Sequence, residues 1–236
     1  MANDLTFGGL PEPEFRREIE MYLRVGKADD AANRLKALME GLCGPSRPLP
    51  ARFLTIGPKD VDLVGWSHLP QRIKDYNKRS NNITAIGIDF SSPSHFSSFP
   101  DENGLLEPHI ETNYYIDSDE LPFSTSDRPG LLECYEKNRS TRLGRPKWAG
   151  CFEEIDNTIS VKGISDLYGA VHRINRTDPT TDEKQAKVLG ACYVAVLVHL
   201  AVRDFAPRNI LPRPMAVIVG SNDDYPFFQA PAFAAR

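Results

Sequence analysis

Three residues in the middle of the chain carry side chains that could share a metal ion. His109 and Glu111 lie two positions apart in the stretch HIETNYYID, and the alternation of a β-strand would place both on one face. Asp89 ends another predicted strand and could add a carboxylate. One imidazole with two carboxylates is a ligand set of catalytic metal centres, which would make the protein a metal-dependent hydrolase. No H-E-x-x-H or comparable spacing accompanies them, so the alternative is three ordinary members of an acidic segment.

Other catalytic motifs are missing from the sequence. It contains no G-x-x-x-x-G-K-[ST], no G-x-G-x-x-G and no G-x-S-x-G, so we expect no cofactor. Gly65-Trp66-Ser67 matches only the start of the last motif, and Ser165 occupies the equivalent place in a second, similar stretch. We therefore interpret both serines as helix N-caps and not as nucleophiles. His199 lies inside an apolar run, where a neutral histidine is more often a structural group than a ligand.

A further stretch that could bind a ligand follows a predicted buried strand near the C-terminus. The sequence Gly-Ser-Asn-Asp-Asp begins at Gly220, where the strand ends. Open α/β sheets often bind ligands at the carboxyl ends of their strands. The same residue types are favoured in turns, so an ordinary turn is the alternative.

The most unusual composition is an acidic stretch without basic residues. From Ser80 to Asp127 there is no Lys or Arg. The acidic residues of this stretch are Asp89, Asp101, Glu102, Glu107, Glu111, Asp117, Asp119, Glu120 and Asp127. The next twenty residues are rich in Arg and Lys, so one interpretation is that the two segments neutralise each other. The other is an acidic face that attracts a basic protein by long-range electrostatics.

For such a face we expect a group of charges flanked by aromatic anchors. The residues that we predict to bind a partner are Asp117, Asp119, Glu120, Tyr115 and Phe123. The sequence then favours a non-catalytic interaction protein, for instance an inhibitor or immunity-type protein that masks a basic partner. The alternative is the metal-dependent hydrolase that would use Asp89, His109 and Glu111.

The overall composition limits the location and the kinds of partner. A balance of 28 basic and 32 acidic residues, with net charge −4, gives no reason to expect nucleic-acid binding. The four cysteines are widely spaced without a C-x-x-C pair, which favours free thiols in a reducing compartment. The first residues show neither the basic nor the apolar region of a secretion signal. We therefore expect a cytoplasmic protein.

One apolar run must organise the fold that positions these residues. Val188 to Val202 comprises fifteen residues without a formal charge. A helix that is apolar on all sides must be enclosed, and this run is shorter than the roughly 18 apolar residues expected of a membrane span. We predict the central helix of a globular core, with no membrane contact. Gly190 within it should mark a close approach to another element.

The N-terminal part is predicted to be a helical hairpin. Apolar residues recur at helical spacing from Glu14 to Val25 and from Ala28 to Leu42, with a break at Gly26. The proline-rich linker 44–50 then ends the second helix. We place this hairpin and linker in residues 1–50 and a single α+β domain in residues 51–236.

The second part is predicted to contain an internal duplication, in segments 51–127 and 148–236. The 26 residues from Phe53 and the 26 residues from Cys151 align without a gap at an offset of 98. Each copy reads as strand, turn, strand, Gly-x-Ser-x-Leu and helix, and strands 83–90 and 215–220 would close the two copies. The predicted fold class is α+β (mixed α/β), with the N-terminal hairpin followed by two related ββαβ halves around the long buried helix.

Overall fold

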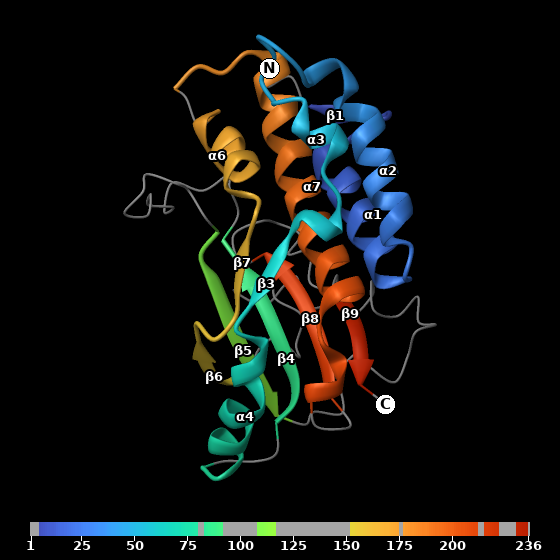
Figure 1. The fold of residues 1–236 in the computed structure, drawn as a ribbon. Coiled ribbons are helices and arrows are strands. Elements are labelled where there is room, and N and C mark those ends of the chain that lie inside the picture. The colour runs from blue at the N-terminus through green and yellow to red at the C-terminus, as the bar shows by residue number, and fades with distance from the viewer. Residues whose placement is uncertain are drawn as a thin grey trace.

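The computed structural model describes residues 5–79, 83–91, 108–116, 152–174, 177–211, 215–221 and 230–235. Its helices and strands form an α+β fold, as the sequence predicts. One long helix, α7 (Thr181–Phe205), runs from the end where the N-terminal helices gather to the end that holds the main sheet (Figure 1).

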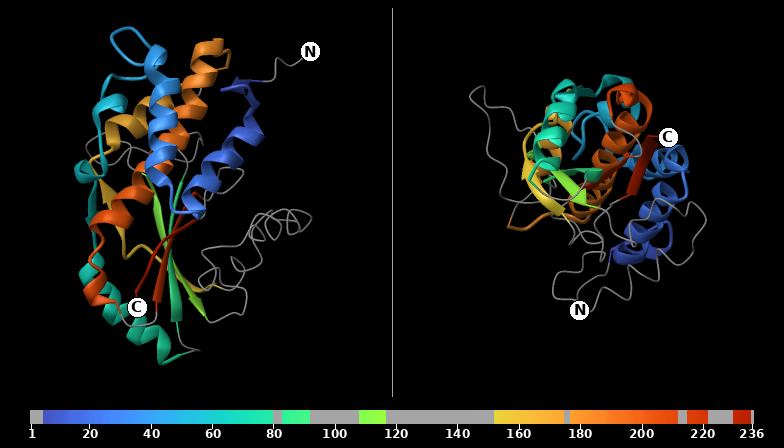
Figure 2. Two further views of the ribbon diagram at one scale, coloured as in Figure 1. Left: turned by 90° about the vertical axis from the view of Figure 1, so that its right-hand side faces the viewer. Right: turned by 90° about the horizontal axis from the view of Figure 1, so that it is seen from below.

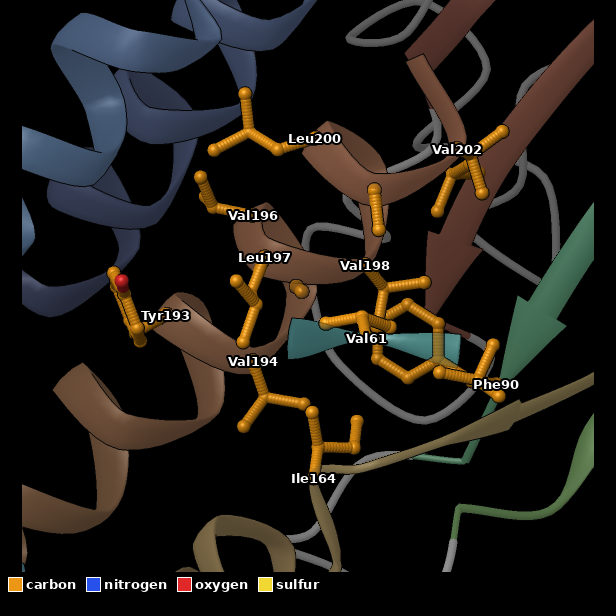
Figure 3. Close-up of a cluster of buried hydrophobic side chains, with 14 of the residues drawn as sticks. Val61, Phe90, Ile164, Tyr193, Val194, Val196, Leu197, Val198, Leu200 and Val202 are labelled. Carbon is orange, nitrogen blue, oxygen red and sulfur yellow. The ribbon is translucent and has the colours of Figure 1, made fainter. Parts of the chain in front are cut away.

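α7 is enclosed by the rest of the chain along most of its length. Every residue from Val188 to Val202 is buried, which is the stretch predicted as the central helix. Length and composition would let α7 cross a membrane, but most of its apolar stretch lies inside the protein. Figure 3 shows Val194 and Val198 of α7 in one cluster with Phe90, Val61 and Ile164, which come from separate segments of the chain. α7 is therefore the centre of the core.

The N-terminal helices form the predicted hairpin. Two short paired strands, β1 (Thr6–Phe7) and β2 (Leu10–Pro11), precede α1 (Glu12–Arg24) and α2 (Ala28–Met39). In the turn between the helices Gly26 has a φ of 77°, a conformation that favours glycine. α2 lies along α7 (Figure 1). The inner faces of the two helices bury Phe15, Ile19, Leu23, Ala31, Leu35 and Met39.

Both ends of α7 are fixed by polar contacts. At its start, Thr180 Oγ1 accepts a hydrogen bond from Glu183 N at 3.2 Å, and the Glu183 carboxylate accepts one from Thr180 N at 2.8 Å. This capping box satisfies backbone N–H groups that a helix end leaves unpaired. At its end, Arg203 Nη1 donates to Asp29 Oδ2 of α2 at 2.8 Å. The Arg203–Asp29 contact ties the end of α7 to the N-terminal hairpin.

A second helix crosses α7 where the sequence places a glycine. A Cβ at Gly190 would lie 2.6 Å from Val171 Cγ2 of α6 (Ser165–Arg173). Only a residue without a side chain allows the two helices to approach so closely. The predicted close approach at Gly190 is therefore confirmed.

The main sheet has five strands in the order β6-β5-β4-β8-β9. Its two central strands, β4 and β8, are parallel, and the other pairs are antiparallel. The chain passes from β4 to β5 on one side and from β8 to β9 on the other. The bounds are β4 (Ile83–Phe90), β5 (Ile110–Ile116), β6 (Phe152–Asp156), β8 (Met215–Ser221) and β9 (Ala230–Ala235).

A separate two-stranded sheet joins the two predicted copies. In it β3 (Asp62–Val64) pairs antiparallel with β7 (Ser160–Lys162), and Leu63 faces Val161, its equivalent at the offset of 98. Gly65 follows β3 with a φ of 97°, and Gly163 follows β7 with a φ of 88°. Gly65 lies against the backbone of Thr158, while Gly163 lies against the backbone of Asp60. The contact is reciprocal, because Asp60 and Thr158 also differ by 98 positions.

After these glycines each copy has a helix, but before the strands the copies differ. α4 (Leu69–Asn77) follows Gly65, and α6 follows Gly163. The predicted strand at Phe53 is wrong: the chain forms the short helix α3 (Arg52–Thr55) there, whereas the second copy has β6. Phe53 and Ile56 are both buried, and their spacing of three residues suits a helical turn. The duplication itself stays a prediction.

The prediction that two serines cap helices is also wrong. Ser67 lies inside the 3-10 turn Trp66–His68, and Ser165 is the first residue of α6. The residues before α4 and α6 are His68 and Ile164, and neither makes a side-chain cap. The N-cap position of α4 is His68 and that of α6 is Ile164, so each lies one residue away from the serine predicted to cap the helix.

Replacing Gly65 or Gly163 by alanine is expected to destabilise the fold by roughly 3 kcal/mol each. A Cβ at either position would collide with a backbone oxygen, and the positive φ adds its own cost. Urea unfolding measures the loss. Gly41→Ala is the matched control, since Gly41 has no atom within 4 Å of an added Cβ, and it should change stability by less than about 0.5 kcal/mol. Losses below about 1 kcal/mol in both test variants would contradict the tight contact.

Stability should also depend on pH through His199. This residue is buried in α7, and burial, together with the Arg203 charge, lowers its pKa to about 4. The unfolded chain takes up the proton near pH 6.5, so stability is lost as the pH falls from about 6.5 to 4. We expect the wild type to lose roughly 3 kcal/mol relative to His199→Leu over that range. Urea unfolding of both proteins at pH 7 and pH 4 measures this loss. A difference in stability between the two proteins that is the same at both pH values would show that folded and unfolded chains protonate His199 equally, which would contradict the prediction.

Candidate functional site at the carboxyl ends of β4 and β8

Two parallel strands end side by side in the middle of the sheet. Asp89 of β4 pairs with Gly220 of β8, and Phe90 pairs with Ser221. The strand that follows β4 in the chain, β5, lies on one side of this pair, and the strand that follows β8, β9, lies on the other. In open α/β sheets ligands bind at such a divergence, outside the carboxyl ends of the strands. We call this part of the sheet the carboxyl edge and treat it as the candidate site.

Asp89 is buried at the carboxyl edge next to an amide. Only 3% of the residue is exposed, and Asn113 Nδ2 donates to Asp89 Oδ2 at 2.6 Å. A carboxylate removed from water needs such donors to remain ionised. Asn113 is 5% exposed, and its Oδ1 has no hydrogen-bond partner in the described part of the chain. The pair belongs to the interior of the protein.

His109 and Glu111 lie at the surface of the same edge. Glu111 pairs with Asp89 across β4 and β5, so the three predicted metal ligands share one end and one face of the sheet. His109 Nε2 lies 4.0 Å from Glu111 Oε1, and the His109 side chain is 63% exposed. Asp89 instead contacts Asn113, inside the protein.

The three predicted ligands therefore divide into a buried carboxylate and an exposed pair. Among the residues that the structure describes, no group of three or more His, Cys, Asp or Glu side chains is arranged to hold a metal ion. The metal centre of Asp89, His109 and Glu111 is not formed in this arrangement. The metal-dependent hydrolase stays a prediction, without a formed ligand set among the described residues.

A hydrogen-bond network holds β4, β5 and α6 together at the carboxyl edge. Ser91 N donates to His109 O at 2.9 Å, and His109 N donates to Ser91 Oγ at 3.1 Å. The buried hydroxyl of Tyr168 on α6 lies 2.9 Å from Ser91 Oγ and donates to Ser91 O at 3.2 Å. Sequence reasoning missed Tyr168, because Ser91 is 77 positions away and no local pattern links them. Asn113 could have been found from its place on the same strand face as Glu111.

The residues predicted to bind a partner are almost all outside the described part. Asp117, Asp119, Glu120 and Phe123 fall between the described residues 116 and 152. Tyr115 lies on β5, where the structure describes its backbone. The turn after Gly220 is described only as far as Ser221.

The chain was also compared with known proteins. No protein-family model, no curated protein and no solved structure matches it. What the chain does must therefore be inferred from its own residues.

Asn113→Asp is expected to destabilise the protein at pH 7 by roughly 3 kcal/mol. The new carboxylate would lie within hydrogen-bond distance of Asp89, and two carboxylates so close cannot both stay ionised. One of the two pKa values is raised, so the folded chain binds the extra proton and stability recovers as the pH falls. Urea unfolding at pH 7 and pH 5 measures both effects. Glu111→Gln, on the same face but more exposed, is the control, and an Asn113→Asp loss that is equal at both pH values would contradict an interaction with Asp89.

Proposed function

We propose that the protein is a non-catalytic interaction protein that binds a basic protein partner, in the cytoplasm, through the acidic residues of the segment from Ser80 to Asp127. One observation carries the proposal: this segment has no Lys or Arg and provides both β4 and β5, two neighbouring strands in the interior of the main sheet. Two parts of the segment are therefore fixed in the sheet.

β4 and β5 are held firmly in the fold. β4 pairs with β5 over the whole length of both strands, and Phe90 of β4 is buried in the core cluster. Ser91 directly follows Phe90, and its hydrogen bonds with His109 and Tyr168 join this end of β4 to β5 and α6. A binding surface attached to such elements loses little conformational freedom when a partner binds. Asp117 follows directly after the last residue of β5.

Basic residues of the chain itself compete with a partner for pairing with these carboxylates. Ile116 pairs with Ile83, and Ile83 N donates to Asn77 Oδ1 at the end of α4. α4 and the residues that follow it carry Lys74, Lys78 and Arg79, all exposed. Lys78 is already paired with Asp75 at 2.8 Å. Carboxylates near Ile116 could thus meet internal cations, and the experiment has to separate this from partner binding.

The proposed action is masking. Negative potential increases the rate at which a basic protein associates, and salt screens the effect over about 10 Å at 0.1 M. Dissociation is governed instead by close contacts, for which Tyr115 and Phe123 are the aromatic candidates. The partner would be held with its basic surface covered, and no covalent bond would be made or broken.

Changing Asp117→Asn, Asp119→Asn and Glu120→Gln together should slow association with the partner by about tenfold at low salt. The partner is first captured from native cell extract with the wild-type protein and identified, and stopped-flow measurements then follow its association at two ionic strengths. Tyr115→Ala or Phe123→Ala should instead raise the dissociation rate.

The matched control removes three exposed carboxylates elsewhere, by Glu14→Gln, Asp30→Asn and Glu40→Gln. It has the same net charge as the test variant and should change the association rate less than about twofold. Equal slowing in both would show an effect of net charge alone. An unchanged association rate together with reduced stability in the test variant would show internal pairing with α4, and either result would overturn the proposal.

A further inference from the structure

A pocket of about 450 Å³ lies beside α4. Figures 1 and 2 show α4 at the sheet end of the molecule, away from the N-terminal hairpin. α4 and the turn before it form one wall, and the turn between β6 and β7 forms the other. The pocket is lined by His68, Gln71, Arg72, Asp75, Asn157 and Thr158. It is separate from the carboxyl edge and from the residues proposed to bind a protein.

Arg72 at this pocket is paired with a half-buried carboxylate. Its Nε lies 3.7 Å from Asp156 Oδ2, which is an ion pair but too long for a hydrogen bond. Asp156 is itself held in place: it accepts hydrogen bonds from Tyr76 OH at 2.9 Å, Tyr114 OH at 3.3 Å and Thr158 N at 2.8 Å. The carboxylate therefore orients the guanidinium without using its donors.

The donors of Arg72 remain available to a ligand. The Arg72 side chain is 56% exposed, and in the described part of the chain it makes no hydrogen bond. A guanidinium offers five N–H groups in a planar fork that fits two oxygens of a carboxylate or phosphate. An arginine that is held at one edge and open at the other suits the binding of an oxyanion.

Other donors in the pocket point to the same class of ligand. Thr158 also lines the pocket, and its Oγ1 is buried beside the Tyr114 hydroxyl. His68 is exposed, and its imidazole N–H can add a donor.

The one carboxylate in the lining is already engaged. Asp75 accepts from Lys78 Nζ at 2.8 Å and from Gln71 Nε2 at 2.9 Å. These bonds, first of all the one from Lys78, lower the pKa of Asp75, so its charge is neutralised by a neighbour and repels an anion less.

A larger pocket, of about 910 Å³ beside the start of α7, does not have this character. It contains Arg47 and Arg173, but three carboxylates line it as well. The start of α7 is capped by Thr180 and Glu183, so its backbone N–H groups are partly satisfied. The larger pocket is therefore less suited to an anion than the smaller one.

We propose that the pocket beside α4 binds a small oxyanion group, a phosphate or a carboxylate, through the guanidinium of Arg72 assisted by Thr158 and His68. Asp156 acts as a positioning residue because it is paired with Arg72, and Tyr76 and Tyr114 in turn hold Asp156 in place. The site uses none of the acidic residues of the segment from Ser80 to Asp127 and would give the protein a second, oppositely charged recognition point.

The probes are inorganic phosphate and acetate, each titrated into ¹⁵N-labelled full-length protein at pH 7, with sodium chloride at matched ionic strength as the blank. Saturable amide shifts are expected at residues 68, 69, 71 and 72 and at residues 157 and 158. Arg72→Gln should weaken binding by about tenfold or more, and Arg72→Lys should weaken it less, since lysine keeps the charge but loses the fork. Thr158→Val should weaken it about threefold. Because Arg72 is exposed, these variants at that position should keep the wild-type melting temperature.

Lys74→Gln and Arg173→Gln are the matched controls. Lys74 is an exposed cation on the same helix outside the pocket lining, and Arg173 lines the larger pocket. Each should change affinity less than about twofold. Saturation by phosphate alone identifies a phosphate site, and saturation by acetate alone identifies a carboxylate site. Saturation by both probes identifies a site for either oxyanion. No saturable shift with either probe, shifts centred on residue 173, or equal weakening by Lys74→Gln and Arg72→Gln would overturn the proposal.

Discussion

The enclosure of α7 is the constraint on which the rest of the structure depends. A helix with apolar residues on every side is stable in water only when other elements cover it completely. The N-terminal hairpin, α6, the β3–β7 sheet and the main sheet supply that cover, and they do so from distant parts of the chain. Figure 3 shows the result around Val194 and Val198. The polar residues of the carboxyl edge and of the smaller pocket therefore lie at the ends of the sheet and on α4.

Two carboxylates beside the main sheet are paired with neighbouring side chains, and the pairs decide what each site can do. Asp89 is engaged by Asn113, and Asp156 is engaged by Tyr76 and Tyr114. The first pair takes a carboxylate away from His109 and Glu111, so a three-ligand metal site is not formed. The second pair leaves a carboxylate within reach of Arg72 and thereby orients a guanidinium toward a pocket.

The β3–β7 contact shows how a short motif can fix two segments nearly one hundred residues apart. Gly65 and Gly163 each lie against the backbone of the opposite segment, and neither position has room for a side chain. A reciprocal contact between residues at a constant offset is what a duplicated unit would produce. The start of the two units differs, since one forms α3 where the other forms β6.

The sequence by itself determined the elements whose signal is local. The buried central helix, the N-terminal hairpin and the strands at 83–90, 110–116 and 215–220 follow from apolar periodicity and from the glycines and prolines that bound them. Tertiary structure decided which strands are neighbours, and so whether Asp89 lies with Asn113 or with His109. It also joined Asp156 to Tyr76 across 80 positions and Tyr168 to Ser91 across 77. Such contacts are set by the packing of whole elements around α7, and no pattern within a few residues of the chain encodes them.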